Sequence, residues 1–268
     1  APHVPVHLGS MGESVRAILR DNRGQMRPGD VFMQNAPYNG GTHLPDVTVI
    51  TPCWDEAGEE ILFFVGSRGH HADIGGRTPG SSPPDSRRIE EEGIVIDNWL
   101  LVEGGVFREE ATRQLLCSGP YPCRKVEQNL ADLVAQVAAN ETGIRELRRM
   151  VAHFGLDTVR AYMGHVQDNA EESVRRVLAV LRDGSFTYAM DDGSRIQVQI
   201  RVDHAAREAI IDFTGTSAQH AGNRNAPRSV CRAAVLYVFR TLIDSDLPLN
   251  EGCLKPLKLI IPEGTMIN

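Results

Sequence analysis

Two short glycine-rich segments each place a histidine three residues before an aspartate. Gly-Gly-Thr-His-Leu-Pro-Asp contains His43 and Asp46, and Gly-His-His-Ala-Asp-Ile-Gly-Gly contains His70 and Asp73. Imidazole and carboxylate ligands together suit Mn, Fe, Co or Zn, and glycines let the backbone come close to a small site. We therefore predict that these four side chains hold one divalent metal ion. The alternative is that they make turn and capping hydrogen bonds within their own loops.

Three further side chains near these segments are candidates for catalysis. Only one of His70 and His71 can face the metal, because neighbouring side chains in an extended segment point in opposite directions. We assign His70 to the metal because its spacing to Asp73 repeats that of the first pair. His71 is then predicted to support a ligand or to act as an acid or base. Arg68 is a candidate to bind a substrate carboxylate or phosphate, and the alternative is an ordinary salt bridge. Glu13 is a candidate contributor to the site, and the alternative is a charge at the start of a helix.

The elements that must position these side chains are predicted to be strands. Residues 61–66 form a continuous apolar run, typical of a buried strand, which leads directly into the second histidine segment. Residues 31–34 and 47–51 are predicted strands on either side of the first histidine segment. Side chains that follow a buried strand are held by a rigid scaffold, which favours a functional site there.

The rest of the chain predicts a mixture of helices and strands. Residues 11–20 and 233–243 have helical spacing, and the helical pattern from about 125 to 182 is interrupted at Gly155, which indicates a long helical hairpin. Further strands are predicted at 196–202, 209–213 and 257–261. Asp132, Gln136 and Asn140 share one helix face, which either meets a site or another subunit or is solvated.

We therefore predict an α+β (mixed α/β) fold, with a β-sheet core, glycine-rich loops that carry the site, and the long helical hairpin. Its predicted regions are 1–124, which holds the metal site, 125–183, the hairpin, and 184–268, a second α+β region, unless all three form one continuous domain. The chain begins without Met and ends in a strand pattern, so we interpret it as a portion of a longer protein.

Composition excludes several classes of protein. The formal net charge of −7, with both signs interspersed, argues against a nucleic-acid-binding protein. No apolar run approaches the roughly 18–20 residues of a membrane span, and no secretory leader is visible. The five cysteines form no Cys-x-x-Cys motif, which favours free thiols. We therefore expect a cytoplasmic protein without a membrane or nucleic-acid partner.

Several motifs, in the same order along essentially the whole chain, resemble the hydantoinase B / 5-oxoprolinase family. They include Pro-Tyr-Asn-Gly-Gly-Thr-His-Leu-Pro-Asp at 37–46, Ser-Arg-Gly-His-His-Ala-Asp-Ile-Gly-Gly at 67–76 and Asp-Phe-Thr-Gly-Thr-Ser at 212–217. One departure is Ala36, where the family usually has Asp in Asn-Asp-Pro-Tyr. If that Asp belongs to the site, its loss weakens binding; if it only caps a turn, the loss costs on the order of 1 kcal/mol.

The resemblance implies a B-type subunit or domain that acts with an A-type partner. The partner binds ATP and activates the substrate by phosphorylation, and the B part, assisted by its metal, completes the opening of a cyclic amide such as a hydantoin or 5-oxoproline. The chain contains no Walker-type phosphate loop, consistent with ATP on the partner. The alternatives are a subunit of an ATP-dependent ketone carboxylase and a non-catalytic scaffold for the A-type partner.

Overall fold

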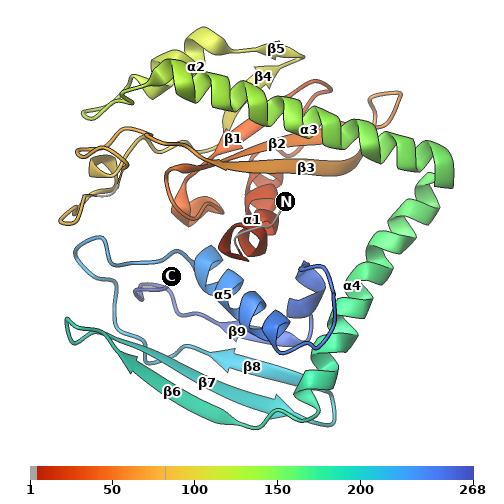
Figure 1. Cartoon of the computed structure of the whole chain (residues 1–268), viewed down its shortest axis with the longest axis vertical. Coiled ribbons are helices and arrows are strands. Elements are labelled where there is room, and N and C mark those ends of the chain that lie inside the picture. The colour runs from red at the N-terminus through yellow and green to blue at the C-terminus, as the bar shows by residue number, and fades with distance from the viewer. Residues whose placement is uncertain (1–4, 82) are drawn as a thin grey trace. The chain divides into compact units, whose positions relative to one another are not determined.

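The chain divides into two compact units. The computed structural model describes residues 5–81 and 83–268, and Figure 1 shows its helices and strands in chain order. One unit is Met11–His153, and the other is Phe154–Asn268 together with the described part of Ala1–Ser10. Each unit has its own sheet and its own core, so each is described separately.

A five-stranded antiparallel sheet forms the centre of Met11–His153. Its strands are β1 (Val31–Gln34), β2 (Asp46–Trp54), β3 (Ile61–His70), β4 (Trp99–Glu103) and β5 (Val106–Phe107), in the spatial order β3-β2-β1-β4-β5. The longest pairing joins β2 to β3 and runs from Asp46 opposite His70 to Trp54 opposite Ile61. The two predicted glycine-rich segments therefore meet at one end of this pair.

Helices cover both faces of this sheet (Figure 1). The part of α1 (Pro5–Asp21) that belongs to this unit packs Ile18 against Phe32 and Ile50. On the opposite face, α3 (Val126–Phe154) packs Leu130 and Leu133 in a cluster that includes Val47. Because successive side chains of a strand alternate between faces, Val47 and Ile50 serve different layers, and β2 is buried on both sides. The short helices are η1 (Pro37–Asn39), η2 (Ile89–Glu91) and α2 (Glu109–Leu116).

The segment before the first histidine is anchored by one buried amide. The Asn35 Nδ2 group donates to the carbonyl oxygens of Leu44 at 2.8 Å and Ile94 at 2.9 Å, and its Oδ1 accepts from the Ile96 backbone N–H at 2.6 Å. Asn35 is fully buried, so these bonds replace water that cannot reach the groups. One side chain therefore ties the first histidine segment to the chain at 94–96.

A four-stranded sheet forms the second unit. Its strands are β6 (Gly184–Ala189), β7 (Arg195–Asp203), β8 (Glu208–Asp212) and β9 (Leu257–Ile260), in that order, and only β8 and β9 are parallel. Parallel neighbours require a long connection, which here contains α5 (Arg228–Thr241) and η3 (Glu251–Leu254). Together α4 (Leu156–Leu178) and α5 cover one face, with Val174, Leu178 and Phe239 in a core that includes Ile211.

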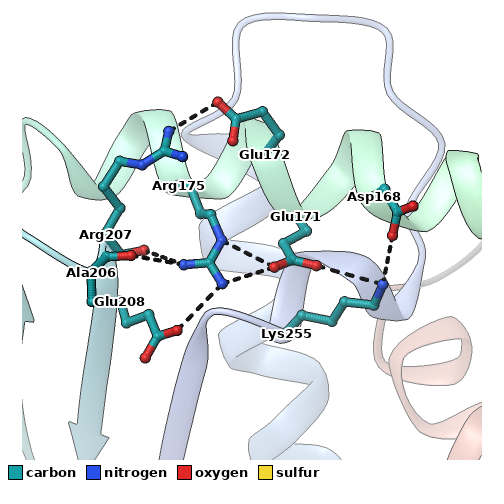
Figure 2. Close-up of polar contacts among 8 residues, drawn as sticks. All are labelled: Asp168, Glu171, Glu172, Arg175, Ala206, Arg207, Glu208 and Lys255. Atoms are coloured by element: carbon teal, nitrogen blue, oxygen red, sulfur yellow. Dashed lines mark hydrogen bonds and ion pairs between the residues drawn. The ribbon is translucent and has the colours of Figure 1, made fainter.

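Charged side chains tie α4 to the strands of this unit (Figure 2). Glu171 lies between two cations: Arg175 approaches it at 2.8 Å and Lys255 at 3.5 Å, and Lys255 also pairs with Asp168 at 3.0 Å. Arg175 donates to the carbonyl oxygens of the β7–β8 turn, at 3.0 Å and 3.1 Å. Exposed ion pairs each contribute little, but their combination with carbonyl bonds fixes the helix over this turn.

The predicted α+β class is confirmed, with two sheets and two long consecutive helices joined at Gly155. The boundary between the compact units falls within the predicted hairpin region 125–183, so α3 belongs to one unit and α4 to the other. Each long helix buries its apolar residues against a different sheet: α3 in the core with Val47, and α4 in the core with Ile211. Among the described residues, no helix combines the length and apolar character needed to cross a bilayer.

We predict that Asn35→Ala lowers the free energy of unfolding by about 3 kcal/mol, because it leaves several buried backbone groups without partners. The matched control is Asn39→Ala, since the Asn39 side chain bonds only to exposed carboxylates and an exposed arginine; it should cost less than about 1 kcal/mol. Urea unfolding of both variants measures the difference. Equal losses would contradict the anchoring role of Asn35.

Candidate metal centre

Three of the four predicted ligands come together at the end of the β2–β3 pair. Asp46 and His70 are direct cross-strand partners, so their side chains share a face. The Asp46 Oδ1 atom lies 2.9 Å from His70 Nδ1, and its Oδ2 lies 3.5 Å from His43 Nδ1. The possible ligand atoms of His43, Asp46 and His70 all lie within 4.8 Å of one another.

A turn brings His43 to this end of the sheet. The Asp46 backbone N–H donates to the His43 carbonyl oxygen at 2.9 Å, which closes the three-residue spacing of the motif. The preceding Gly41 packs so closely that a Cβ there would lie 2.4 Å from the Asn35 carbonyl oxygen. Only glycine fits at this position, so the glycine-rich composition of the segment has a steric cause.

The burial of the three side chains suits an accessible metal site. Asp46 has a side chain only 5% exposed, whereas those of His43 and His70 are 46% and 61% exposed. The two rings are stacked, with centroids 5.7 Å apart and planes at 22°. One carboxylate and two imidazoles are a donor set for Zn, Mn, Fe or Co that leaves coordination positions for water or substrate. These residues therefore fit a divalent ion.

The structure does not bring Asp73 to this cluster. Its Oδ2 accepts from Arg124 Nη1 at 2.7 Å, and its Oδ1 accepts from the backbone N–H groups of Gly75 at 2.9 Å and Arg124 at 3.2 Å. Burial opposes ionisation, but these hydrogen bonds and the charge of Arg124 outweigh it and lower the pKa of the Asp73 carboxyl. Because β3 ends at His70, the turn that joins His43 to Asp46 is not repeated. Asp73 instead closes its own loop.

His71 points to the opposite face from His70, as strand alternation predicts. It is 2% exposed, and its Nε2 and Nδ1 atoms lie 3.1 Å from Gln136 Oε1 and 3.0 Å from Asn129 Nδ2. Burial lowers the pKa of His71, and the hydrogen bond to Gln136 partly offsets this. The structure therefore gives His71 a buried supporting position rather than one at the open cluster.

Arg68 lies on the face of Asp46 and His70. Its Nε donates to Thr48 Oγ1 at 2.7 Å and its Nη2 donates to Ser14 Oγ, on α1, at 2.8 Å. Burial lowers the pKa of the Arg68 guanidinium to about 10, against the opposing charge of Asp46, so the group stays positive at neutral pH. Arg68 therefore places a fixed positive charge near the cluster.

Glu13 lies on α1, where its Oε1 pairs with Arg16 at 2.7 Å. This i, i+3 pair lies in the middle of α1, which begins at Pro5, so Glu13 is not the predicted helix-start charge. Ala36 occupies the N-cap position of η1 and makes no side-chain cap bond. The geometry therefore favours the view that an aspartate at position 36 would cap this turn.

The supporting amides on α3 were only partly evident from the sequence. Gln136 and Asn140 belong to the predicted polar stripe and are buried, whereas Asp132 is only half-buried. Asn129 was missed; its spacing of seven residues from Gln136, two helical turns, is the signal that would have found it. Asn129, Gln136 and Asn140 all bond to groups at or near the sheet, so a solvated stripe does not describe them.

We predict that Asp73→Ala lowers the free energy of unfolding by about 1–3 kcal/mol, because it leaves three donors of the loop without their acceptor. The pKa of Asp73 is lower in the folded protein than in the unfolded chain. The variant should therefore show its full loss of unfolding free energy, relative to wild type, above pH 3.8, and a smaller loss as the pH falls further. Urea unfolding at several pH values measures this. A difference that grows with acid would contradict the role assigned to Asp73.

Comparisons with known proteins identify the family. A family model described as "Hydantoinase B/oxoprolinase" matches residues 1–268. The 5-oxoprolinase of Saccharomyces cerevisiae is 44% identical, over all of this chain and 22% of that protein. A protein of Pseudomonas sp. that is named as part of a D-/L-hydantoinase is 30% identical, over 96% of this chain and 45% of that protein. The chain therefore spans between about a fifth and a half of the curated relatives it matches.

Solved structures have the same fold. The ATP-dependent caprolactamase from Pseudomonas jessenii superposes with a TM-score of 0.86 at 28% identity, over 98% of this chain and 46% of that chain. An acetone carboxylase superposes with a TM-score of 0.82 at 20% identity, over 98% of this chain and 37% of that chain. The resemblance inferred from the motifs is confirmed: this chain belongs to the hydantoinase B/oxoprolinase family.

Proposed function

We propose that this chain provides the metal-assisted part of an ATP-dependent enzyme that hydrolyses a cyclic amide. The observation that carries the proposal is the cluster of His43, Asp46 and His70, with one buried carboxylate between two accessible imidazoles. The relatives support the substrate class, because 5-oxoproline, hydantoin and caprolactam all contain an amide within a ring.

The chemistry of the site follows from what ring opening requires. An amide is stabilised by resonance, so hydrolysis needs an activated carbonyl and a water nucleophile. A divalent ion held by His43, Asp46 and His70 would supply Lewis-acid activation. Asp46, buried at the start of β2, lies between the two imidazoles, at hydrogen-bond distance from His70 and 3.5 Å from His43. Arg68, which remains positive, would attract a carboxylate or phosphate on the substrate.

We propose that ATP is bound by an A-type subunit or domain. The relatives that support this are much longer than the chain, which covers 22% of the yeast 5-oxoprolinase and 46% of the ATP-dependent caprolactamase chain. Phosphorylation of the amide oxygen by that partner would create a leaving group for the reaction at this site.

The five cysteines are all free in the structure, which supports placing the protein in the reducing cytoplasm.

A ketone carboxylase is the second candidate for the enzyme to which this chain contributes. The superposition with acetone carboxylase favours it, although at 20% identity the likeness extends to the fold alone. Bicarbonate-dependent ATP hydrolysis in the presence of a ketone would identify this activity. In the scaffold alternative, the histidine and aspartate loops are structural, and His43→Ala would leave the activity of the complex intact.

We predict that the purified full chain binds close to one equivalent of Mn, Fe, Co or Zn, and that His70→Ala and Asp46→Ala each lose it. Asp73→Asn is the matched control and should retain the metal, because Asp73 is engaged with Arg124 outside the cluster. Elemental analysis of the three variants beside wild type measures this. A wild type that takes up no metal after incubation with divalent ions would refute the proposed site.

We predict that Arg68→Lys lowers kcat/KM for ATP-dependent cyclic-amide hydrolysis by about 10- to 100-fold, equivalent to about 1.4–2.7 kcal/mol. Lysine keeps the charge but loses the planar fork that reaches Thr48 and Ser14 together. Steady-state kinetics of the chain with its A-type partner measure this. The control is Arg16→Lys, which alters an exposed arginine of α1 and should leave kcat/KM unchanged. An equal effect of both substitutions would contradict a specific role for Arg68.

A further inference from the structure

Gln136 contacts the neighbours of both strand ligands of the candidate metal centre. Its Nε2 group donates to the carbonyl oxygen of Val47, the residue after Asp46, at 2.9 Å. Its Oε1 lies 3.1 Å from Nε2 of His71, the residue after His70. One buried amide on α3 thus reaches both strands from the face opposite the metal ligands.

The residue before His70 permits this close approach. A Cβ at Gly69 would lie 3.3 Å from the Cδ atom of Gln136, tighter than most such contacts. Glycine at this position therefore leaves the room that the Gln136 side chain occupies. The glycine in the Gly-His-His segment serves the helix behind the sheet, rather than the approach of the backbone to a metal.

The hydrogen-bond partners assign one state to His71. Gln136 Nε2 faces the Val47 carbonyl, so its Oε1 must accept, and His71 Nε2 must carry a proton. Asn129 Nδ2 donates both to the Asp73 carbonyl oxygen, at 2.9 Å, and to His71 Nδ1, at 3.0 Å. His71 Nδ1 is therefore an acceptor, and the ring is a neutral imidazole with its proton on Nε2.

His71 also connects the two segments that carry the ligands. Its backbone N–H donates to the carbonyl oxygen of Pro45 at 2.8 Å, within the turn that joins His43 to Asp46. Its ring is held on α3, as described above. Both ligand segments are thus tied through His71 to the same helix.

We infer that Gln136, Asn129 and His71 are positioning residues for the metal centre: they hold His70 and Asp46 at the spacing that a divalent ion requires. The inference rests on the proposed metal site and extends it to residues that touch neither metal nor substrate. A ligand orientation maintained by such partners typically changes metal affinity by about 10- to 100-fold when a partner is removed.

The test is a cobalt(II) titration of the full chain, followed by its visible absorption spectrum. Gln136→Met should weaken cobalt binding about 10- to 100-fold and alter the spectrum. The matched control is Asn140→Leu, since Asn140 lies one turn further along α3 and bonds to the Val49 carbonyl at 3.0 Å and to Thr51 at 3.1 Å, away from the ligands. It removes a similar tether and should leave affinity and spectrum unchanged.

Rescue separates positioning from general stability. Gln136→Glu keeps the acceptor for His71 but, as a carboxylate, has no donor for Val47, so it should recover part of the cobalt affinity that Gln136→Met loses. Equal cobalt affinity in wild type and Gln136→Met would overturn this inference alone. No cobalt binding by the wild type would overturn the proposed metal site and this inference with it.

Two further measurements cover a Gln136→Met variant that does not fold. Asn129→Leu removes the donor to the other ring nitrogen of His71 and should also weaken cobalt binding, with Asn140→Leu as its control. In the wild type, long-range proton–nitrogen NMR correlations should place the His71 ring proton on Nε2. A proton on Nδ1, or on both nitrogens, would overturn the network.

Discussion

The candidate site depends on the contacts of the buried Asp46 carboxylate with two imidazoles. Asp46 lies at the first position of β2, directly opposite His70, and its two oxygens lie beside His70 and His43, which come from different segments. A carboxylate that is only 5% exposed is costly to bury unless it has partners of opposite charge or a bound cation. The turn at 43–46 and the end of β3 bring the two imidazoles to this one group.

The second constraint is how α3 is attached to the sheet. Leu130 and Leu133 provide apolar packing, but Gln136 and Asn140 donate to carbonyl oxygens of β2 that lie within the sheet. Apolar packing alone tolerates small shifts of a helix, whereas hydrogen bonds to defined carbonyls do not. Asn140 therefore holds the helix further along β2, at Val49, whereas Gln136 holds it beside the strand ends that carry the ligands.

The two histidine–aspartate pairs look equivalent in the sequence but have different surroundings in the fold. The first pair closes a turn before a strand begins, so both side chains reach one cluster. The second pair straddles the end of a strand, and its aspartate is captured by Arg124 and by the N–H of Gly75. A spacing of three residues therefore brings side chains together only where the backbone turns.

The sequence by itself determined the class of fold, the buried strand that leads into the second histidine segment, the two long helices and the family. These features depend on periodicity and on motifs, which are local along the chain. Strand alternation also predicted correctly that His70 and His71 face opposite ways. Only the tertiary structure decided that Asp73 leaves the cluster, that α3 and α4 belong to different units, and that Asn129 and Gln136 hold His71. Each of these outcomes depends on a partner distant in sequence, such as Arg124 for Asp73. No local pattern in the sequence encodes which distant group a side chain contacts in the fold.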